Sequence, residues 1–333
     1  MSFLLANCAS FAAPYSAPFW LPGGHLQTIY PALFTKKSQV AYSRERWELA
    51  DGDFIDVDWT ELATELNSKQ PIVILFHGLE GSSQSQYATA LMLAVKAKGW
   101  RGVVIHFRGC SGEPNRLPRV YYAGDTQEIE MMLSRVRAAA PQVPIYAAGV
   151  SLGANALLKW LGESGEHANA VITKAAAVSA PMDLAASADA LDSGLNRWLY
   201  TPGFVNSMRP KALAMSARFT GLLDDKKIND ALTIHDIDNA VTAVLYGATD
   251  ANDYYAKNAS KPWLKQISTP TLVINALNDP FIPSETLPKS NQVSSLVTLE
   301  YSDTGGHVGF VSAHFPGNAN WLPARLIEYF ELP

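Results

Sequence analysis

The sequence predicts an α/β fold in which a mostly parallel central sheet is covered by helices. Short apolar runs alternate with helical patterns through much of the 333 residues, which is typical of strands buried between two helical layers. One of these runs leads through a glycine-flanked serine directly into a helical pattern. Polar loops follow the last two apolar runs. We therefore expect a single domain, 1–333, with its polar groups at one edge of the sheet.

The chain is expected to begin with an irregular arm, residues 1–38, that is rich in aromatic residues and proline and packs on the body. Two β-favouring runs follow, Val40–Leu49 and Phe54–Thr60, joined through Asp51-Gly52. This turn pair between apolar segments predicts an antiparallel hairpin.

The alternating pattern begins after the hairpin. The predicted strands are Ile72–Phe76, Gly102–Phe107, Ile145–Gly149, Ala170–Val178, Thr271–Ala276 and Val297–Tyr301. The predicted helices are Tyr87–Lys98, Gly124–Ala139, Ala154–Leu161 and Trp321–Tyr329.

Residues from about 181 to 268 interrupt the alternation, because they have helical composition and no strong strand. A helical insertion between late strands, above the carboxyl edge of the sheet, is the usual place for a substrate cap. Its apolar side chains either line a pocket or anchor the cap to the body; the candidates are Leu195, Trp198, Leu199, Phe204 and Met208.

The composition excludes several classes of protein. Hydrophobic residues make up 48% of the chain, and the net charge is −5 without a basic tract, which argues against a nucleic-acid partner. Prolines interrupt the apolar N-terminal stretch, and no apolar run reaches about 18 residues, so we expect neither a secretory signal nor a membrane span. With only two cysteines, Cys8 and Cys110, a reducing, cytoplasmic location is expected.

The segment Pro144–Gly153 carries the strongest functional signal. An apolar run climbs into G-x-S-x-G around Ser151, and the helical pattern follows at once. A serine on such a sharp strand-to-helix turn presents its hydroxyl above the sheet edge and is predicted to be a nucleophile. The alternative is a glycine-flanked helix N-cap serine, which explains neither flanking glycine.

A serine nucleophile needs a base and an acid that orients the base. Asp279 lies just beyond the predicted strand Thr271–Ala276, in an Asn-Asp-Pro cluster that also favours a turn. His307 lies in a glycine-rich loop after the last strand, whereas His314 is the weaker candidate. We therefore expect the order Ser151, Asp279, His307, with histidine as general base.

The developing oxyanion needs two N–H donors. One is expected from Leu152, which follows the serine, and the other from Leu79, in the His-Gly loop after Ile72–Phe76. No residue spacing fits a metal site, a P-loop or a dinucleotide motif, so no metal and no cofactor is expected.

With these residues in place, the chain resembles the α/β-hydrolases, and more narrowly the YheT-like branch of esterases. Three segments carry the narrower resemblance: Phe19–Thr28, with Gly-Gly-His-Leu-Gln-Thr; Phe107–Gly112, continuing to Tyr122–Thr126; and Asp253–Tyr255, followed by Ser260. The resemblance implies a serine hydrolase acting on carboxylic esters, with a small acyl ester of short or medium chain as substrate and possible peripheral contact with lipid.

Two other functions remain open. The same acyl-enzyme could transfer its acyl group to an alcohol, although the fifth residue after His307 is Ser312 where some transferases of this fold have aspartate. The chain could also be a hydrolase-like binding module without activity. A peptidase function is less favoured, because the predicted cap has no obvious acidic cluster to bind a peptide amino terminus.

Four residues of the resembling segments have no assigned role. Arg108 is expected either to pair with Asp125 or to contact substrate, and Cys110 to be a small buried side chain or a reactive thiol. His25 and Gln27 either tie the arm to the body or face the pocket.

Overall fold

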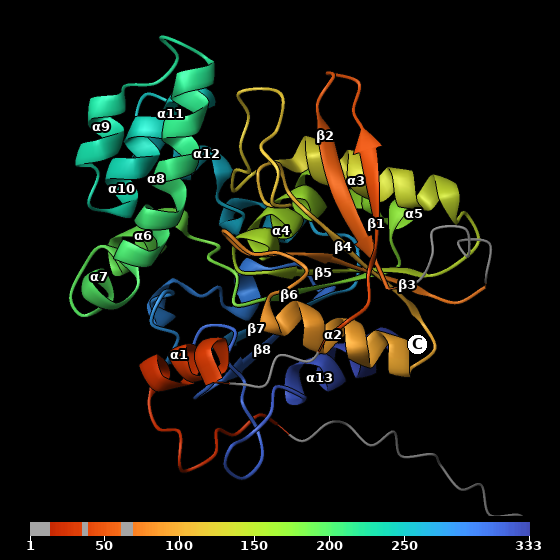
Figure 1. Ribbon diagram of the computed structural model, residues 1–333. Helices are drawn as coiled ribbons and strands as arrows, with labels where there is room; N and C mark the ends of the chain where they lie inside the picture. The colour runs from red at the N-terminus through yellow and green to blue at the C-terminus, as the bar shows by residue number, and fades with distance from the viewer. Residues whose placement is uncertain (1–13, 35–38, 61–68) are drawn as a thin grey trace, which may run out of the picture.

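The computed structural model describes residues 14–34, 39–60 and 69–333. Its centre is an eight-stranded sheet with the order β1-β2-β4-β3-β5-β6-β7-β8 (Figure 1). The strands are β1 (Ser43–Glu48), β2 (Phe54–Trp59), β3 (Ile72–Phe76), β4 (Arg101–Ile105), β5 (Ile145–Val150), β6 (Lys174–Val178), β7 (Thr271–Ala276) and β8 (Val297–Ser302). The hairpin strands β1 and β2 are antiparallel, β2 pairs antiparallel with β4, and all remaining pairs are parallel.

The parallel arrangement fixes where polar groups can gather. The carboxyl ends of β3, β5, β6, β7 and β8 lie at one edge of the sheet, so the loops that follow them are neighbours in space. The predicted fold class is thereby confirmed.

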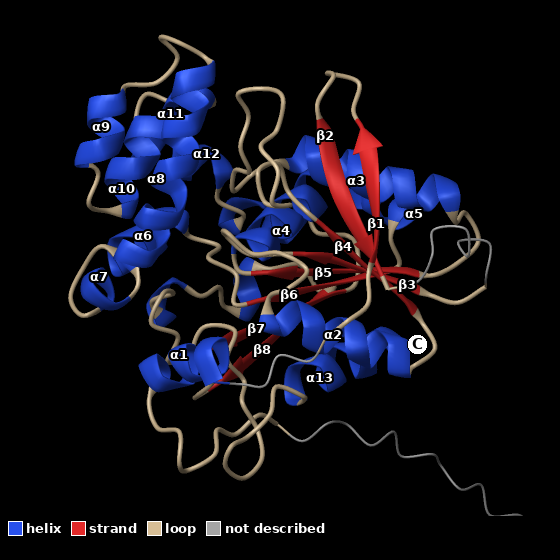
Figure 2. Cartoon of the chain, in the orientation of Figure 1, coloured by secondary structure: helices blue, strands red, loops and turns tan. Residues whose placement is uncertain are grey.

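Helices cover both faces of the sheet (Figure 2). One apolar cluster joins α3 (Thr126–Ala139) and α4 (Leu152–Ser164) to one face, and a second joins α2 (Gln86–Ala97) and α13 (Trp321–Glu331) to the other. Every residue of β3, β5 and β6 is buried, as expected of strands between two helical layers.

Two of the expected elements are wrong. Residues 24–34 form a helix, α1 (Gly24–Phe34), where an irregular arm is expected. Glycine and Pro31 read as helix breakers in the sequence, but Gln27, Thr28 and Pro31 share the buried face of one helix. The strand expected from Ala170 begins only at Lys174, because Ala168–Val171 form the short helix α5. Residues 14–23 have no regular secondary structure, as expected, and residues 1–13 and 35–38 of the arm lie outside the described residues.

Between β6 and β7 the chain is entirely helical and loop (Figure 1). We refer to this stretch as the α6–α12 segment. Its α-helices are α6 (Leu184–Leu191), α7 (Asn196–Leu199), α8 (Thr201–Arg218), α9 (Asp225–Asp230), α10 (Ile234–Ile237), α11 (Ala243–Leu245) and α12 (Ala251–Asn258), with a π-helical turn at Asp238–Thr242. One apolar cluster lies wholly within the segment, and a second joins the segment to Ala123 of the body.

Candidate active site

Ser151 occupies a strained turn between β5 and α4. Its φ of 53° and ψ of −123° are rare for a residue with a side chain, and such strain is concentrated at functional sites. The flanking glycines make the turn possible: a Cβ on Gly149 would lie 2.6 Å from Cα of Ala154, and one on Gly153 would lie 2.4 Å from the carbonyl oxygen of His77. The sequence G-x-S-x-G is therefore a steric requirement of this turn.

The structure brings the three predicted site residues together. Nε2 of His307 lies 2.9 Å from Oγ of Ser151, and Nδ1 of His307 lies 2.8 Å from Oδ2 of Asp279. The Asp279 side chain is fully buried, and its Oδ1 accepts the N–H of Phe281 at 2.8 Å. With Nδ1 donating to the carboxylate, Nε2 is left to accept the serine proton. His314, the weaker candidate, is exposed and outside this chain of hydrogen bonds.

The two proposed oxyanion donors flank the serine. The N–H of Leu152 is at the first turn of α4, and Leu79 lies in the loop after β3. Neither N–H has a hydrogen-bond partner within the part of the chain that the structure describes. A Cβ on Gly78 would stand 3.0 Å from Cβ of Ser151, so glycine lets the Leu79 loop pass close to the nucleophile.

His77 holds this loop in place and takes no part in proton transfer. It is completely buried, Nδ1 donates to the carbonyl of Gly78 at 2.8 Å, and Nε2 accepts the N–H of Phe107 at 3.2 Å. Burial lowers the pKa of His77 to about 3, so the ring stays neutral. The loop after β3 is thereby tied to the end of β4.

The N-terminal arm positions the histidine loop. Oε1 of Gln27 accepts the N–H of Gly305 at 2.8 Å and the side-chain N–H of Asn278 at 2.9 Å, while Oγ1 of Thr28 accepts the N–H of His307 at 2.8 Å. One short helix therefore contacts both the acid loop and the histidine loop. The sequence analysis missed Thr28 and Asn278 and left Gln27 open, and the Gly-Gly-His-Leu-Gln-Thr segment was the signal that pointed to them.

His25 connects the arm to the α6–α12 segment. Its Nδ1 lies 3.1 Å from the hydroxyl of Tyr200, and the two rings stack with centroids 5.9 Å apart. Tyr200 in turn packs edge-on against Phe281, whose ring centroid lies 4.3 Å from that of His307. The arm thus reaches the site from two sides.

The expected pairing of Arg108 with Asp125 is wrong. The guanidinium pairs instead with Asp53 at 2.8 Å, with Asp51 and with Glu128. Asp125 caps α3 through the N–H of Glu128 and pairs with Arg119 at 3.2 Å. The hairpin turn that supplies Asp51 and Asp53 is brought to Arg108 by tertiary packing, which local sequence does not reveal. Three carboxylates thus pair with the guanidinium, which favours a structural role for Arg108.

Cys110 is a half-buried thiol in the loop after β4. Burial raises its pKa to about 12, so the thiol is protonated and weakly nucleophilic. This agrees with a packing role.

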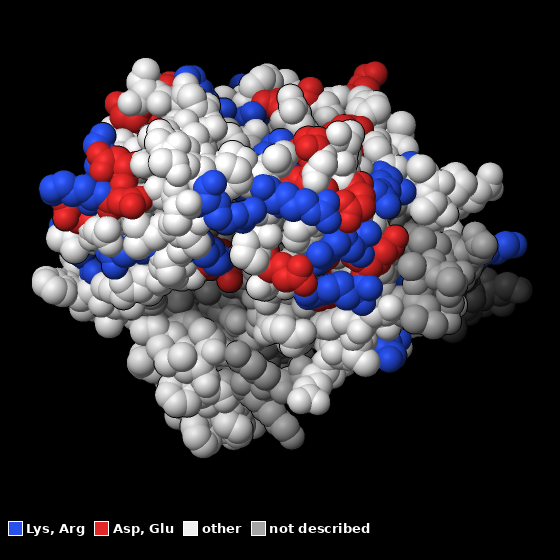
Figure 3. Space-filling model, turned by 45° about the horizontal axis from the view of Figure 1, so that its top comes forward, with Lys and Arg blue, Asp and Glu red and all other residues white. Residues whose placement is uncertain are grey.

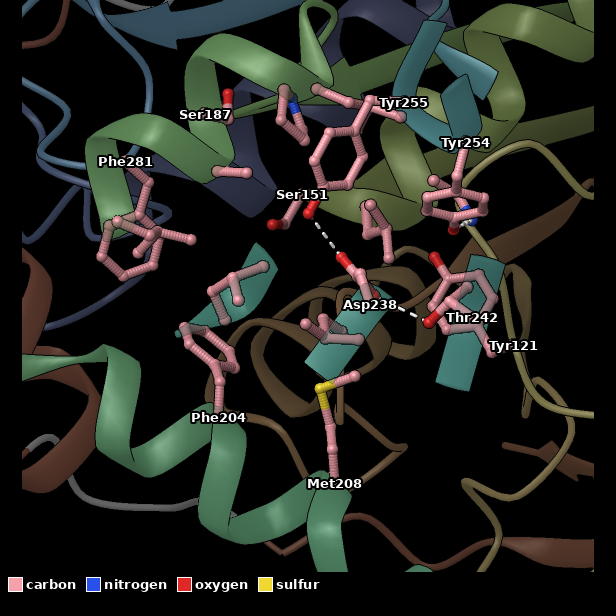
Figure 4. Close-up of a pocket in the computed structure, with 18 of the residues that line it drawn as sticks. Tyr121, Ser151, Ser187, Phe204, Met208, Asp238, Thr242, Tyr254, Tyr255 and Phe281 are labelled. Atoms are coloured by element: carbon pink, nitrogen blue, oxygen red, sulfur yellow. Dashed lines mark hydrogen bonds between the residues drawn. The ribbon is translucent and has the colours of Figure 1, made fainter. Parts of the chain in front are cut away.

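Ser151 and His307 line an apolar cavity of about 100 Å³ (Figure 4), whereas the Asp279 side chain is fully buried. The side of the cavity formed at the sheet edge, which we call the lower wall, includes Leu79, Ser151, Leu152, Phe281 and His307. The side formed by the α6–α12 segment, which we call the upper wall, includes Leu184, Ser187, Ala188, Leu191, Phe204, Met208, Ile234, Asp238, Thr242, Tyr254 and Tyr255.

The expected pocket residues divide into two groups. Phe204 and Met208 lie in the cavity wall, whereas Leu195, Trp198 and Leu199 are 55%, 78% and 45% exposed. A second cavity, of about 470 Å³, adjoins the first and shares with it Leu79, Tyr121, Met208 and Thr242. The two cavities therefore meet at the Leu79 loop.

Residues 14–34, 39–60 and 69–333 contain no group of three His, Cys, Asp or Glu side chains that could hold a metal ion. No helix in the same ranges is long and apolar enough to cross a bilayer.

This combination of fold, serine turn and hydrogen-bonded acid–histidine pair defines a class of hydrolase. A family model described as alpha/beta hydrolase fold matches residues 71–313. The chain belongs to the α/β-hydrolase family.

Its similarity to two relatives extends over nearly the whole chain. It is 36% identical to "Putative esterase YheT" of Escherichia coli over 92% of this chain and 89% of that protein. It is 29% identical to phospholipase ABHD3 of Homo sapiens over 98% of this chain and 81% of that protein. The resemblance to the YheT-like branch is thereby confirmed.

Solved structures agree on the fold. The Pyrococcus furiosus esterase Pf2001 superposes with a TM-score of 0.54 at 15% identity, covering 87% of this chain and 90% of that one. Est1E of Butyrivibrio proteoclasticus, solved with ferulic acid bound, gives 0.53 at 15% identity, covering 87% and 97%.

Proposed function

We propose that this protein is a serine hydrolase that cleaves carboxylic esters through an acyl-enzyme on Ser151. The single observation that carries the proposal is the unbroken chain of hydrogen bonds from Ser151 through His307 to the buried Asp279. Relatives named as an esterase and a phospholipase support ester cleavage.

Each group has a role that follows from its position. Nε2 of His307 takes the serine proton as Oγ bonds to the acyl carbon, and it then gives this proton to the departing alcohol. In the second half of the reaction, His307 takes a proton from water as the water oxygen bonds to the acyl carbon. It then returns this proton to Oγ of Ser151 as the carboxylic acid leaves. Asp279 holds the imidazole in the tautomer with Nδ1–H and stabilises its charged form. The unpaired N–H groups of Leu79 and Leu152 would hold the oxyanion.

The α6–α12 segment is proposed to be the substrate cap. It supplies the apolar upper wall of the cavity, to which Phe204, Met208 and Tyr254 contribute. A small apolar cavity suits acyl chains of short or medium length. The adjoining larger cavity would receive the alcohol.

The proposal is tested with p-nitrophenyl esters of increasing chain length on purified protein. We expect hydrolysis of the short esters, and a loss of at least about 10³ in rate for Ser151→Ala. A fluorophosphonate probe should label the parent protein and not this variant. Equal rates for parent and variant would reject a serine mechanism.

Two other functions are outcomes of the same experiments. Transfer to an alcohol would yield ester product when ethanol is added, whereas hydrolysis yields acid alone. A folded protein that neither reacts with the probe nor turns over esters would be a binding module.

Contact with a lipid surface is proposed for the end of the molecule that carries α1. Residues 14–34 and 304–324 contain no Lys, Arg, Asp or Glu, and Figure 3 shows the charged side chains in a band with an uncharged lobe beneath it. Five apolar side chains are exposed in these two stretches: Phe19, Leu26, Leu33, Phe34 and Phe315. Sedimentation with zwitterionic vesicles should carry down the parent protein, and much less of a Phe19→Ser/Phe34→Ser/Phe315→Ser variant.

A further inference from the structure

One carboxyl group in the cavity has no part in the proposed chemistry. Asp238 lies at the start of the π-helical turn Asp238–Thr242 and is 8% exposed. Its oxygens accept one hydrogen bond each, from Oγ1 of Thr242 and from the hydroxyl of Tyr255, both at 2.7 Å. In Figure 4 the carboxyl lies between these two hydroxyls in the wall of the cavity.

Burying the Asp238 carboxyl group at this position costs folding free energy. In the described part of the chain, no Lys, Arg or His lies within ion-pair distance of it. Burial raises the pKa of Asp238, whereas the two hydroxyl donors lower it. An apolar side chain of similar size would close the cavity wall without this cost. π-Helical turns are frequent at functional sites, and this one carries the carboxyl into the wall.

Asp238 also has hydrogen-bonding capacity to spare. A carboxylate accepts about four hydrogen bonds, and two are used here. Ser187, on α6 in the same wall, is 6% exposed, and its hydroxyl has no partner among the described residues. The mostly apolar cavity wall thus contains two polar groups whose hydrogen bonding is incomplete, Asp238 and Ser187. When Asp238 is ionised, its carboxylate accepts hydrogen bonds and cannot donate them.

We propose that Asp238 is a recognition site for a hydroxyl group on the substrate, so that esters bearing a hydroxyl remote from the ester bond are preferred to plain alkyl esters of equal length. The inference rests on the proposed ester hydrolysis and names its substrate class. A hydroxyl donates to one of the acceptor positions of the carboxylate that Thr242 and Tyr255 leave free, whereas an alkyl chain leaves these positions desolvated and unfilled, which a buried polar site disfavours.

The hydroxyl could belong to the acyl chain or to the alcohol, and two matched pairs of substrates separate these sources. The acyl pair is p-nitrophenyl hexanoate and p-nitrophenyl 6-hydroxyhexanoate. The alcohol pair is butyl butyrate and 4-hydroxybutyl butyrate, and their hydrolysis is measured by the acid that is released. We expect kcat/KM of the parent protein to be at least about tenfold higher for the hydroxylated member of one pair.

The isosteric variant Asp238→Asn should reduce this preference to about threefold or less; the readout is the ratio within each pair, because a change common to both substrates cancels in that ratio. Asp225→Asn, on the exposed start of α9, is the matched control and should keep the preference. A parent ratio near one in both pairs overturns the proposal and needs no variant. An unchanged ratio in Asp238→Asn, accompanied only by a lower Tm, assigns the carboxyl a purely structural role and also overturns it.

Failure of the underlying function has a different signature. If the parent protein and Ser151→Ala hydrolyse p-nitrophenyl acetate equally, ester hydrolysis itself is rejected. Turnover of the acetate with no preference in either pair rejects only the role of Asp238.

Discussion

The two walls of the cavity are built in different ways. The lower wall consists of loops at the sheet edge, where Asp279 and His307 are held by two or more hydrogen bonds each. The upper wall belongs to the α6–α12 segment, which has one apolar cluster of its own and shares a second with Ala123 of the body. Under the proposed function, the hydrogen-bonded loops of the lower wall would hold the reacting groups in place, and the apolar side chains of the upper wall would select the substrate. Changes in the lower wall should therefore affect every ester, and changes in the upper wall only some.

The largest effect is expected at Asp279, which is buried beside the lower wall and contacts His307. Asp279→Asn keeps the shape of the side chain but no longer holds the tautomer of His307 that accepts the serine proton, so kcat should fall by about 10⁴ for esters of every length. Stopped-flow and steady-state rates with p-nitrophenyl acetate and octanoate measure it. A loss confined to one chain length would show that Asp279 acts in selection instead.

An intermediate effect is expected where the arm supports the lower wall. Gln27→Leu removes the acceptor for the N–H of Gly305 and for Asn278, so the histidine loop is less well placed and kcat should fall about 10- to 100-fold with little change in KM. Gln142→Leu, at an exposed position, is the control. If the Gln27 variant kept full kcat, the arm would have no positioning role.

A smaller and selective effect is expected in the upper wall. Phe204→Ala enlarges the cavity, so the ratio of kcat/KM for octanoate to that for acetate should change by about tenfold, with acetate itself unaffected. Trp198→Ala, in the same segment but 78% exposed, should leave the ratio unchanged. Equal losses for both esters in Phe204→Ala would remove the distinction between the walls.

The smallest effect near neutral pH concerns stability. His77 has a pKa of about 3 in the folded protein and about 6.5 when unfolded, so above pH 6.5 it is neutral in both states and contributes no pH dependence. Below pH 6.5 the unfolded chain binds a proton that the native protein excludes, and the free energy of unfolding falls by up to about 1.4 kcal/mol per pH unit. Urea denaturation of the parent and of His77→Gln between pH 7.5 and 5 measures this, and the variant should show the shallower slope. Parallel slopes would mean that His77 is protonated in the native state.

How far the sequence predicts the site depends on how local each feature is. The turn at Ser151 is marked by the local pattern G-x-S-x-G, and Asp279 and His307 each follow a recognisable strand, so these positions could be proposed directly. Parallel pairing then accounts for their meeting at one edge.

The remaining features depend on partners far away in the chain. Gln27 acquires its role from residues near 278 and 305, and Arg108 takes its partners from a hairpin turn more than 50 residues earlier. Asp238 stands in a stretch of ordinary helical composition, and only its burial beside the cavity sets it apart. No local pattern carries such information.

The contacts of Gln27 and Thr28 with the histidine loop join segments that lie 278 and 279 residues apart in the sequence. A chain released from the ribosome before residue 307 would already contain β1 to β8, yet it would lack its base, and Thr28 would lack a residue to hold. Under the proposed function, activity would therefore report that these two distant segments have folded onto each other, and not only that the sheet has formed.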